Sequence, residues 1–205
     1  MSKATISSAR NAETVSANLL PRDGEAWLID DALSKEHADS CFSDLLESVD
    51  WQQEHAVLFG RQIPIPRLTA WYGAHGYAYS GIRHEPVPLT STLKALTSTI
   101  EDITGARFNS VLINLYRDGQ DSMGWHSDDE PVLGPEPEIA SLSLGALRRF
   151  HFKHKTSAER VALDLAHGSC LIMRGCCQAC WRHQLPKTRK RIGPRINLTF
   201  RTICA

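Results

Sequence analysis

The chain has 205 residues, of which 42% are hydrophobic and 22% charged, a composition typical of globular proteins that excludes an intrinsically disordered chain. Its 23 basic and 23 acidic residues cancel, so the net charge does not indicate a polyanionic partner. No stretch resembles a signal peptide or is long enough to span a bilayer. We therefore expect a cytoplasmic protein, or a nuclear one in a eukaryote, whose cysteines are free thiols.

The N-terminal half is predicted to contain two helices. Residues 1–20 are polar and expected to be flexible, and residues 21–205 are expected to form a single domain. Apolar residues recur at helical spacing in 34–49, which opens with a capping serine, and in 88–105, which ends with a capping glycine. Between them, residues 57–81 are rich in aromatic residues, proline and glycine, which favours short strands and loops.

From residue 108 onward the pattern is that of β-structure. Short alternating or apolar runs, punctuated by turn residues, predict strands at 108–116, 139–145, 149–154, 160–165, 169–173 and 195–201. Short strands that follow two helices indicate an α+β protein whose β half is a sandwich or a barrel.

The segment "GWHSDDE" (124–130) contains a candidate metal site. On a strand end, residues two apart point the same way, so His126 and Asp128 could hold one ion from one side. A second histidine from a neighbouring strand, for which His183 is the candidate, would complete the two-histidine, one-carboxylate set of non-haem ferrous iron. Alone, the H-x-D pattern is weak, because a solvated polar turn would also account for it.

Arginines at the C-terminal end strengthen this interpretation. In "RINLTFR" the alternation places Arg195 and Arg201 on one face, and a buried arginine requires an anion. A dicarboxylate chelated to iron would be such an anion. In "INLY" the same period places Asn114 and Tyr116 on one face as further hydrogen-bonding groups. Together these features favour an iron site with a dicarboxylate co-substrate.

These segments resemble the AlkB family of Fe(II)- and 2-oxoglutarate-dependent nucleic-acid dealkylases, most closely the branch that repairs double-stranded DNA and its bacterial relatives. The similarity extends from about residue 57 to 201, in the family's order, through "FGRQIPIPRLTAWYG", "YAYSG", "VLINLYRDGQDSMGWHSDDE", "IASLSLGALRRFHFKHK", "LAHGSCLIMRG", "HQLPKT" and "PRINLTFR". It implies a double-stranded β-helix (jelly roll) with N-terminal helices, a nucleotide-recognition lid at about 55–85 and a catalytic core at about 106–203.

The resemblance also implies roles for individual residues. The implied iron ligands are His126, Asp128 and His183, and Asp129 would join them in catalysis. The implied 2-oxoglutarate ligands are Asn114, Tyr116, Arg195 and Arg201, of which Arg201 would lie near the iron and could pair with Asp128. The implied contacts to the damaged base and to DNA are Phe59, Arg67, Tyr77, Tyr79, Ser80 and Glu130. Among these, Phe59 would fill the gap in the base stack and Arg67 would touch phosphate.

The implied reaction is the oxidative dealkylation of N-alkylated bases, such as 1-methyladenine and 3-methylcytosine, flipped out of DNA. It would consume O2, convert 2-oxoglutarate to succinate, release formaldehyde and so repair DNA by direct reversal. Glu130 would favour cationic damaged bases over neutral normal ones. RNA is a further candidate substrate, and we expect a monomer without a membrane partner.

Two alternatives stay open. Cys176, Cys177, Cys180 and His183 have spacings that could hold zinc in a binding module without catalysis. The chain could also be a 2-oxoglutarate hydroxylase that acts on protein or a small molecule. Against the second stands the basic segment 182–201, which has seven Lys or Arg and no Asp or Glu, and whose residues 187–191 could contact phosphates.

Overall fold

The computed structural model describes residues 17–58, 60–74, 76–79 and 82–204, and gives only the backbone of residues 58, 77–79 and 82–84. Residues 1–16 of the expected flexible N-terminus therefore lie outside the described part.

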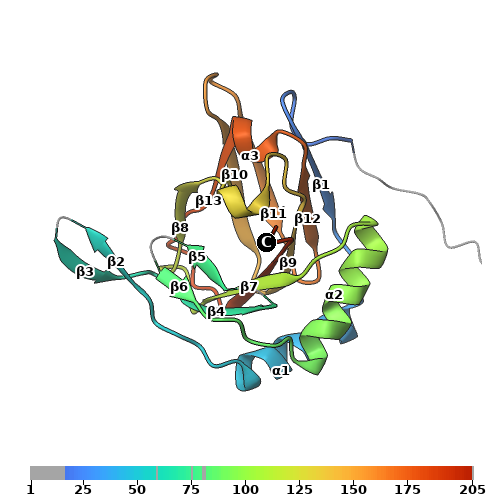
Figure 1. The fold of residues 1–205 in the computed structure, drawn as a ribbon, viewed down its shortest axis with the longest axis vertical. Coiled ribbons are helices and arrows are strands. Elements are labelled where there is room, and N and C mark those ends of the chain that lie inside the picture. The colour runs from blue at the N-terminus through green and yellow to red at the C-terminus, as the bar shows by residue number, and fades with distance from the viewer. Residues whose placement is uncertain (1–16, 59, 75, 80–81, 205) are drawn as a thin grey trace, which may run out of the picture.

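Two antiparallel sheets form the body of the protein (Figure 1). The larger sheet has six strands in the spatial order β1 (Glu25–Ile29), β12 (Cys170–Arg174), β9 (Ile139–Gly145), β14 (Arg195–Arg201), β7 (Ser110–Tyr116) and β4 (Leu68–Gly73). The smaller sheet has four, in the order β11 (Arg160–Leu165), β10 (Arg148–His154), β13 (Trp181–Leu185) and β8 (Met123–His126). Two sheets with strands that cross over repeatedly are the arrangement of a jelly roll.

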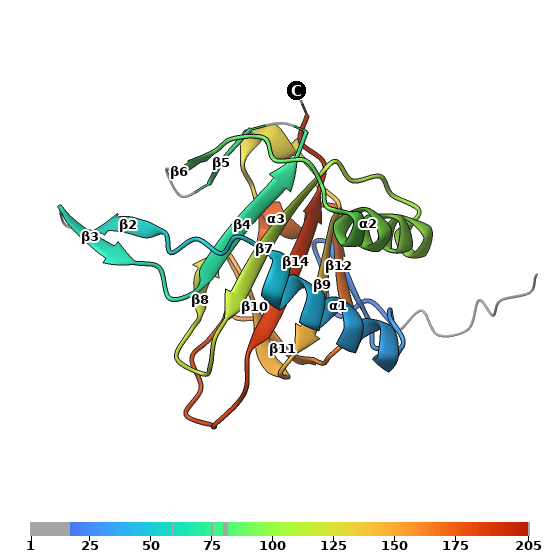
Figure 2. The same ribbon diagram turned by 90° about the horizontal axis from the view of Figure 1, so that it is seen from below.

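The two predicted helices lie across the strands of the large sheet (Figure 2). They are α1 (Lys35–Ser48), capped by Ser34, and α2 (Ser91–Thr104), which ends at Gly105 with a φ of 74°. Glycine suits this left-handed position because it lacks a Cβ. The apolar faces of both helices are buried against the sheet in one core cluster, to which Leu45 and Leu93 contribute fully buried side chains. The helices thus cover one face of the large sheet and leave the other for the second sheet.

Strand β14 separates an apolar from a polar layer. Its side chains alternate, so Ile196 and Leu198 join the core beneath the helices. Arg195, Asn197 and Arg201 point the other way, into a pocket, and are also buried. Buried polar groups are costly unless they have partners. The polar inner face of this sheet is therefore the place where a polar ligand is expected.

The predicted strands occur close to their expected bounds. The runs 139–145, 160–165 and 195–201 are strands over the same residues, and the others shift by one or two residues at an end. Strand β1 was not predicted, and β8 and β13 were expected only as the strands that carry the candidate ligands, without bounds. In β13, "WRHQL", charged and polar side chains alternate with buried ones, which gives a weak apolar signal.

The predicted lid region forms two small hairpins. One consists of β2 (His55–Leu58) and β3 (Arg61–Pro64), and it projects from the body in Figure 1. The other consists of β5 (Tyr77–Tyr79) and β6 (Ile82–His84). Two short elements complete the fold, the 3-10 helix η1 (Pro131–Leu133) and the one-turn helix α3 (Cys177–Cys180). In the described part of the chain, no helix has the length and apolarity needed to cross a membrane.

Candidate metal and dicarboxylate site

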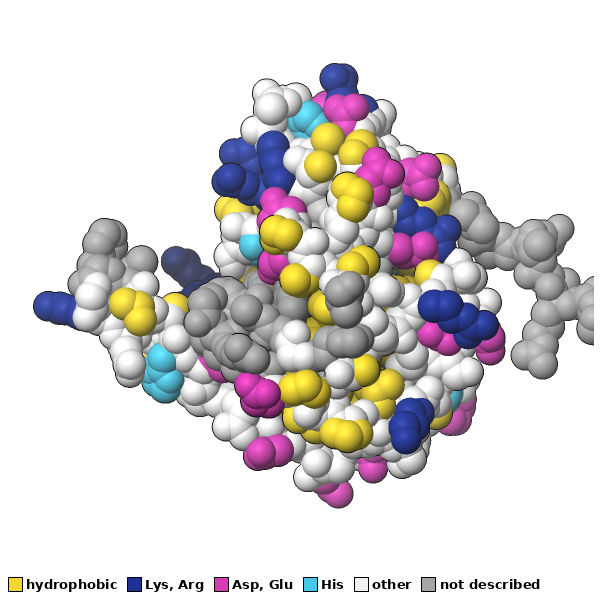
Figure 3. All heavy atoms as spheres, viewed as in Figure 1, with side chains coloured by type: hydrophobic (Ala, Val, Ile, Leu, Met, Phe, Trp, Pro, Cys, Tyr) yellow, Lys and Arg dark blue, Asp and Glu magenta, His cyan; other side chains and the backbone are white. Residues whose placement is uncertain are grey.

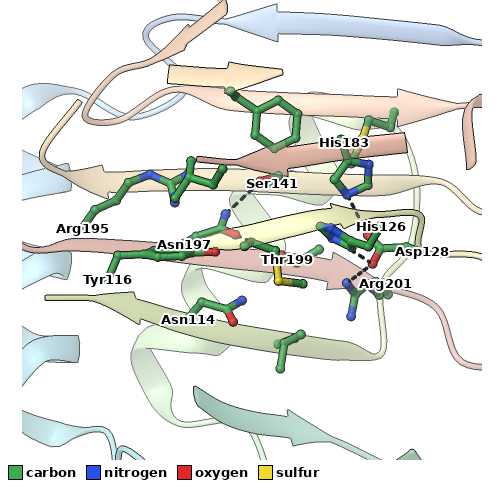
Figure 4. A pocket seen from close by; sticks show the side chains of 15 residues that line it. Asn114, Tyr116, His126, Asp128, Ser141, His183, Arg195, Asn197, Thr199 and Arg201 are labelled. Atoms are coloured by element: carbon green, nitrogen blue, oxygen red, sulfur yellow. Dashed lines mark hydrogen bonds and ion pairs between the residues drawn. The ribbon is translucent and has the colours of Figure 1, made fainter. Parts of the chain in front are cut away.

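The candidate site is a pocket between the two sheets, shown in Figure 4. Its polar lining comes from the inner faces of β7, β9 and β14, and its other wall from β8, β10 and β13. At one end lie His126, Asp128 and His183, and at the other Arg195 and Tyr116 (Figure 4). The pocket therefore has two chemically different ends.

The structure brings together the three predicted metal ligands. His126 ends β8 and pairs directly across the sheet with His183 on β13, while Asp128 follows two residues later. The ligand atoms of these three residues all lie within 4.8 Å of one another. The cross-strand pairing of β8 with β13 thus places the candidate third ligand, His183, beside the other two.

Hydrogen bonds and packing orient each ligand. The His126 ring has Nδ1 2.8 Å from the Gly124 carbonyl oxygen, which can only accept, so Nδ1 carries the proton and Nε2 is available to a metal. The main-chain N–H of Asp128 donates to Oε1 of Gln178 over 3.0 Å. The Phe150 ring stacks on His183 with centroids 5.4 Å apart. Such outer partners fix the direction of metal ligands.

The protonation states suit a divalent metal. Burial alone would raise the pKa of Asp128, but Arg201 and the two imidazoles lower it to about 2. Burial, together with the neighbouring His126, lowers the pKa of His183 to about 3. At neutral pH the carboxylate is ionised and the His183 imidazole is neutral, which are the forms that bind a metal. Two imidazoles and one carboxylate on one side of an ion are the donor set of non-haem Fe(II) oxygenases.

The other end of the pocket presents a buried cation. The Arg195 side chain is 2% exposed and donates to Ser143 Oγ over 2.8 Å. Its guanidinium also lies 5.3 Å from the centre of the Tyr116 ring, and burial lowers its pKa to about 10. Among the described residues, the Arg195 Nε–H has no hydrogen-bond acceptor. A buried guanidinium with an unused donor fits a carboxylate, so the residues present suit an anion that reaches from Arg195 to the metal ligands.

Arg67 does not lie where the sequence led us to expect. Its side chain is 4% exposed, and its Nε–H donates to Oδ1 of Asn114 over 2.8 Å. A guanidinium turned into the protein in this way offers no support for the predicted phosphate contact, which stays a prediction. Arg67 contacts Asn114, which lines the pocket.

The two acidic residues after Asp128 lie outside the metal group. Asp129 is 3.2 Å from Nζ of Lys155, and its side chain is 60% exposed. Glu130 is half-buried at the start of η1. This position of Asp129 offers no support for its predicted catalytic role, which stays a prediction, as does the role of Glu130.

Four predicted substrate contacts are only partly described. Tyr77 and Tyr79 lie on β5, opposite His84 and Ile82 of β6. Phe59 and Ser80 lie outside the described residues.

Several pocket residues were not named from the sequence. Asn197 donates to Ser141 Oγ over 2.8 Å, and both line the pocket with Thr199. The alternation that singled out Arg195 and Arg201 also places Asn197 and Thr199 on the same face, and this signal could have found them. Gln178 had no such signal, because it acts from a separate helix.

The cysteine cluster does not form a zinc site with His183. In the part of the chain that the structure describes, His126, Asp128 and His183 are the only group of three or more His, Cys, Asp or Glu residues close enough to share a metal ion. The Cys177 thiol is 1% exposed, and burial raises its pKa to about 12. A thiol rather than a thiolate indicates a packing role.

Comparisons with known proteins agree with this site. Residues 25–201 match the 2OG-Fe(II) oxygenase superfamily. The chain is 41% identical to the Homo sapiens protein "DNA oxidative demethylase ALKBH2" over 82% of this chain and 70% of the relative. The chain belongs to the AlkB family. It is also 48% identical to the Bos taurus "Alpha-ketoglutarate-dependent dioxygenase alkB homolog 3", over 81% of this chain and 62% of that protein. The AlkB-family chain thus spans about three fifths of the alkB homolog 3 relatives.

The fold comparison confirms the predicted architecture. The chain titled "The structure of OsALKBH1" superposes with a TM-score of 0.64 and 16% identity, covering 86% of this chain and 96% of the other. Together with the superfamily match, this likeness confirms a jelly-roll oxygenase fold. Members of this superfamily use Fe(II), 2-oxoglutarate and O2. The His126–Asp128–His183 group at one end of the pocket fits Fe(II), and Arg195 at the other end fits the distal carboxylate of 2-oxoglutarate.

Proposed function

We propose that this AlkB-family chain oxidatively dealkylates N-alkylated bases in DNA. The observation that carries the proposal is the pocket itself, in which the His126–Asp128–His183 group, with Asp128 and His183 buried, faces the buried cation Arg195. The printed name of the human relative, a DNA oxidative demethylase, supports DNA as the substrate.

Each group has a role in this reaction. Iron, 2-oxoglutarate and O2, when bound, would supply the oxidant that hydroxylates the N-alkyl carbon. One oxygen atom of O2 would enter succinate as 2-oxoglutarate loses carbon dioxide, and the other would enter the alkyl group, which leaves the base as formaldehyde when it is a methyl group. His126, Asp128 and His183 would hold the metal, and Arg195 the distal carboxylate of 2-oxoglutarate. Arg201 would stabilise the ionised Asp128 through its 2.7 Å contact. Asn114 and Tyr116 would complete the co-substrate pocket that they line.

The damaged base must leave the helix to reach the metal. Tyr77, Tyr79 and Ser80 would form the walls around it, and Glu130 would favour the positive charge of 1-methyladenine or 3-methylcytosine. The projecting β2–β3 hairpin carries Val57, 72% exposed. Exposed apolar side chains on a projecting hairpin support its insertion into the duplex, with Phe59 filling the space of the lost base.

Exposed basic side chains on the small sheet support a polyanionic substrate. Lys153 of β10 lies directly opposite Arg182 of β13, and both are exposed. Like charges at directly opposed positions repel, and a phosphate between them would remove that repulsion. Figure 3 shows Lys and Arg side chains gathered over these strands. Exposed Lys187, Arg189 and Lys190 follow β13 and would extend the phosphate contacts.

The experiment is anaerobic loading with Fe(II), then incubation with 2-oxoglutarate, ascorbate, air and an oligonucleotide that carries 1-methyladenine, read by mass spectrometry. We expect the loss of one methyl group from DNA, abolished in His126→Ala and retained in the control His151→Ala. Parallel single-stranded, double-stranded and RNA oligonucleotides decide the preferred nucleic acid. Consumption of 2-oxoglutarate without demethylation of any of them would contradict the proposal and point to a protein or small-molecule hydroxylase. A site of action in the cytoplasm, or in a eukaryotic nucleus, is part of the proposal.

A further inference from the structure

A second buried arginine lies behind the co-substrate pocket. Arg148 begins β10 and is 2% exposed, but it does not line the pocket. Its guanidinium donates to three main-chain carbonyls, those of Asp118 at 3.2 Å, Asp121 at 2.9 Å and Pro186 at 2.7 Å. The first two belong to the turn after β7 and the third follows β13. Arg148 therefore ties together the two loops that border the Arg195 end of the site.

The charge of Arg148 has no direct counter-ion in the described part of the chain. No carboxylate among the described residues lies within 4.0 Å of it, and the nearby Asp121 carboxylate is bound by Arg117 at 2.7 Å and 2.8 Å. Neutral carbonyls orient a guanidinium but do not cancel its charge. Burial, opposed by Tyr116, Asp121 and Asp118, lowers the pKa of Arg148. The protein thus keeps a buried positive charge at Arg148. Hydrogen bonds that only hold the two loops together would not require a charged donor.

Tyr116 connects this cation to the pocket. The Arg148 guanidinium lies 5.7 Å from the centre of the Tyr116 ring, and that of Arg195 lies 5.3 Å from it. Tyr116 and Arg195 line the pocket, at the end away from His126 and Asp128 (Figure 4). This end of the site therefore carries two cations around one aromatic ring, and in a low-dielectric interior both act on a ligand charge placed there.

We infer that Arg148 is a positioning residue that makes the site selective for a dicarboxylate 2-oxoacid. Its hydrogen bonds hold the loops that place Tyr116, and its charge adds to that of Arg195 at the distal carboxylate. A 2-oxoacid without the distal carboxylate would chelate the metal in the same way but gain nothing from Arg148. The inference rests on the use of 2-oxoglutarate by this superfamily and is independent of the nucleic-acid substrate.

The test measures binding rather than turnover. Fe(II)-loaded protein is titrated anaerobically, by calorimetry, with 2-oxoglutarate and with 2-oxobutyrate, which lacks the distal carboxylate. In Arg148→Met we expect the Kd of 2-oxoglutarate to rise on the order of tenfold and that of 2-oxobutyrate to change less than about twofold. Arg149→Met is the matched control, because the neighbouring Arg149 is half exposed and pairs with Asp164; both Kd values should stay unchanged.

Two results would overturn the inference. Equal weakening of both ligands in Arg148→Met would mean that Arg148 only supports the fold, and no change in either would mean that it has no role in binding. If Arg148→Met does not fold, as judged by circular dichroism, Arg148→Gln decides. It removes the charge but keeps N–H donors for the main-chain carbonyls, and a loss confined to 2-oxoglutarate supports the inference, whereas a parallel loss or no loss contradicts it.

Discussion

Nη2 of Arg201 lies 2.7 Å from Oδ1 of Asp128, and the two side chains are 3% and 2% exposed. The last strand of the large sheet thus pairs with a metal ligand at the end of the small one. Because the pair is buried, removing one partner leaves an uncompensated charge. Arg201 therefore holds Asp128 in its ionised form while no metal is present.

Arg201→Met should destabilise the metal-free protein by about 3 kcal/mol. Added Mn(II) or Fe(II) should raise the free energy of unfolding more in this variant than in the wild type, because the metal ion then balances the buried negative charge of Asp128 in place of Arg201. Urea denaturation with and without metal measures both effects. Arg149→Met, which removes an exposed pair with Asp164, should cost below about 1 kcal/mol. Equal costs in the two variants would contradict the role assigned to Arg201.

His126→Ala should abolish iron binding, because the group loses one of three ligands. Elemental analysis after anaerobic loading and gel filtration measures the iron content. His151→Ala is the control, since His151 contacts Gln184 and lies outside the metal group. Metal at about one hundred times its Kd should stabilise the wild type by about 2.7 kcal/mol and leave His126→Ala unchanged. Zinc that persisted in His126→Ala would revive the cysteine site.

Gln178→Ala should weaken metal binding about 10- to 100-fold. The Gln178 side chain is 1% exposed and accepts a hydrogen bond from the main-chain N–H of Asp128. Without this bond the backbone of Asp128 is less firmly held, and its carboxylate is less well oriented toward the metal. Competition with a chelator of known affinity measures the effect. Gln184→Ala removes an amide of the same size that contacts His151 instead, and it should bind metal normally. A normal metal affinity in Gln178→Ala would show that Asp128 needs no such support.

Arg67→Met should impair co-substrate binding rather than DNA binding. The Arg67 side chain orients Asn114 from inside the protein, so the Kd of 2-oxoglutarate should rise several-fold while the Kd of DNA stays unchanged. Lys190→Ala, on an exposed position, should do the opposite and reduce the salt dependence of DNA binding by about one phosphate contact. Loss of DNA affinity in Arg67→Met would restore the phosphate contact expected from the sequence.

Glu130→Gln should slow the turnover of cationic bases more than that of neutral ethenoadducts, because it removes the charge that favours a cation. Paired oligonucleotides with 1-methyladenine or ethenoadenine, assayed by mass spectrometry, give the ratio of rates. Asp129→Asn is the neighbouring control, because Asp129 pairs with Lys155 on the surface and its change should leave the ratio as it is. Equal losses on both lesions in Glu130→Gln would remove Glu130 from base selection.

Local patterns in the sequence determined much of this protein. The helices α1 and α2 could be predicted because their capping residues and apolar period act within a few residues of chain. That Arg195 and Arg201 lie on the same face of their strand could be predicted from the two-residue period of a strand. His126 and Asp128 could be paired for the same reason, and His183 was a candidate for the third ligand that the resemblance to the AlkB family also implied.

Only the tertiary structure decided which groups meet across long distances in the chain. The register of β8 against β13 places His126 opposite His183, and no local pattern specifies register between strands so far apart. Arg67 is buried with Asn114 as its hydrogen-bond partner, which lies 47 residues away in the chain. The charge of Arg67 alone predicts an exposed side chain. Gln178 reaches Asp128 over 50 residues, and Arg148 lies against Tyr116 from a different sheet. These contacts arise from strand pairing and from the packing of the two sheets and their connections, because burial leaves each polar group to find a partner wherever the fold supplies one.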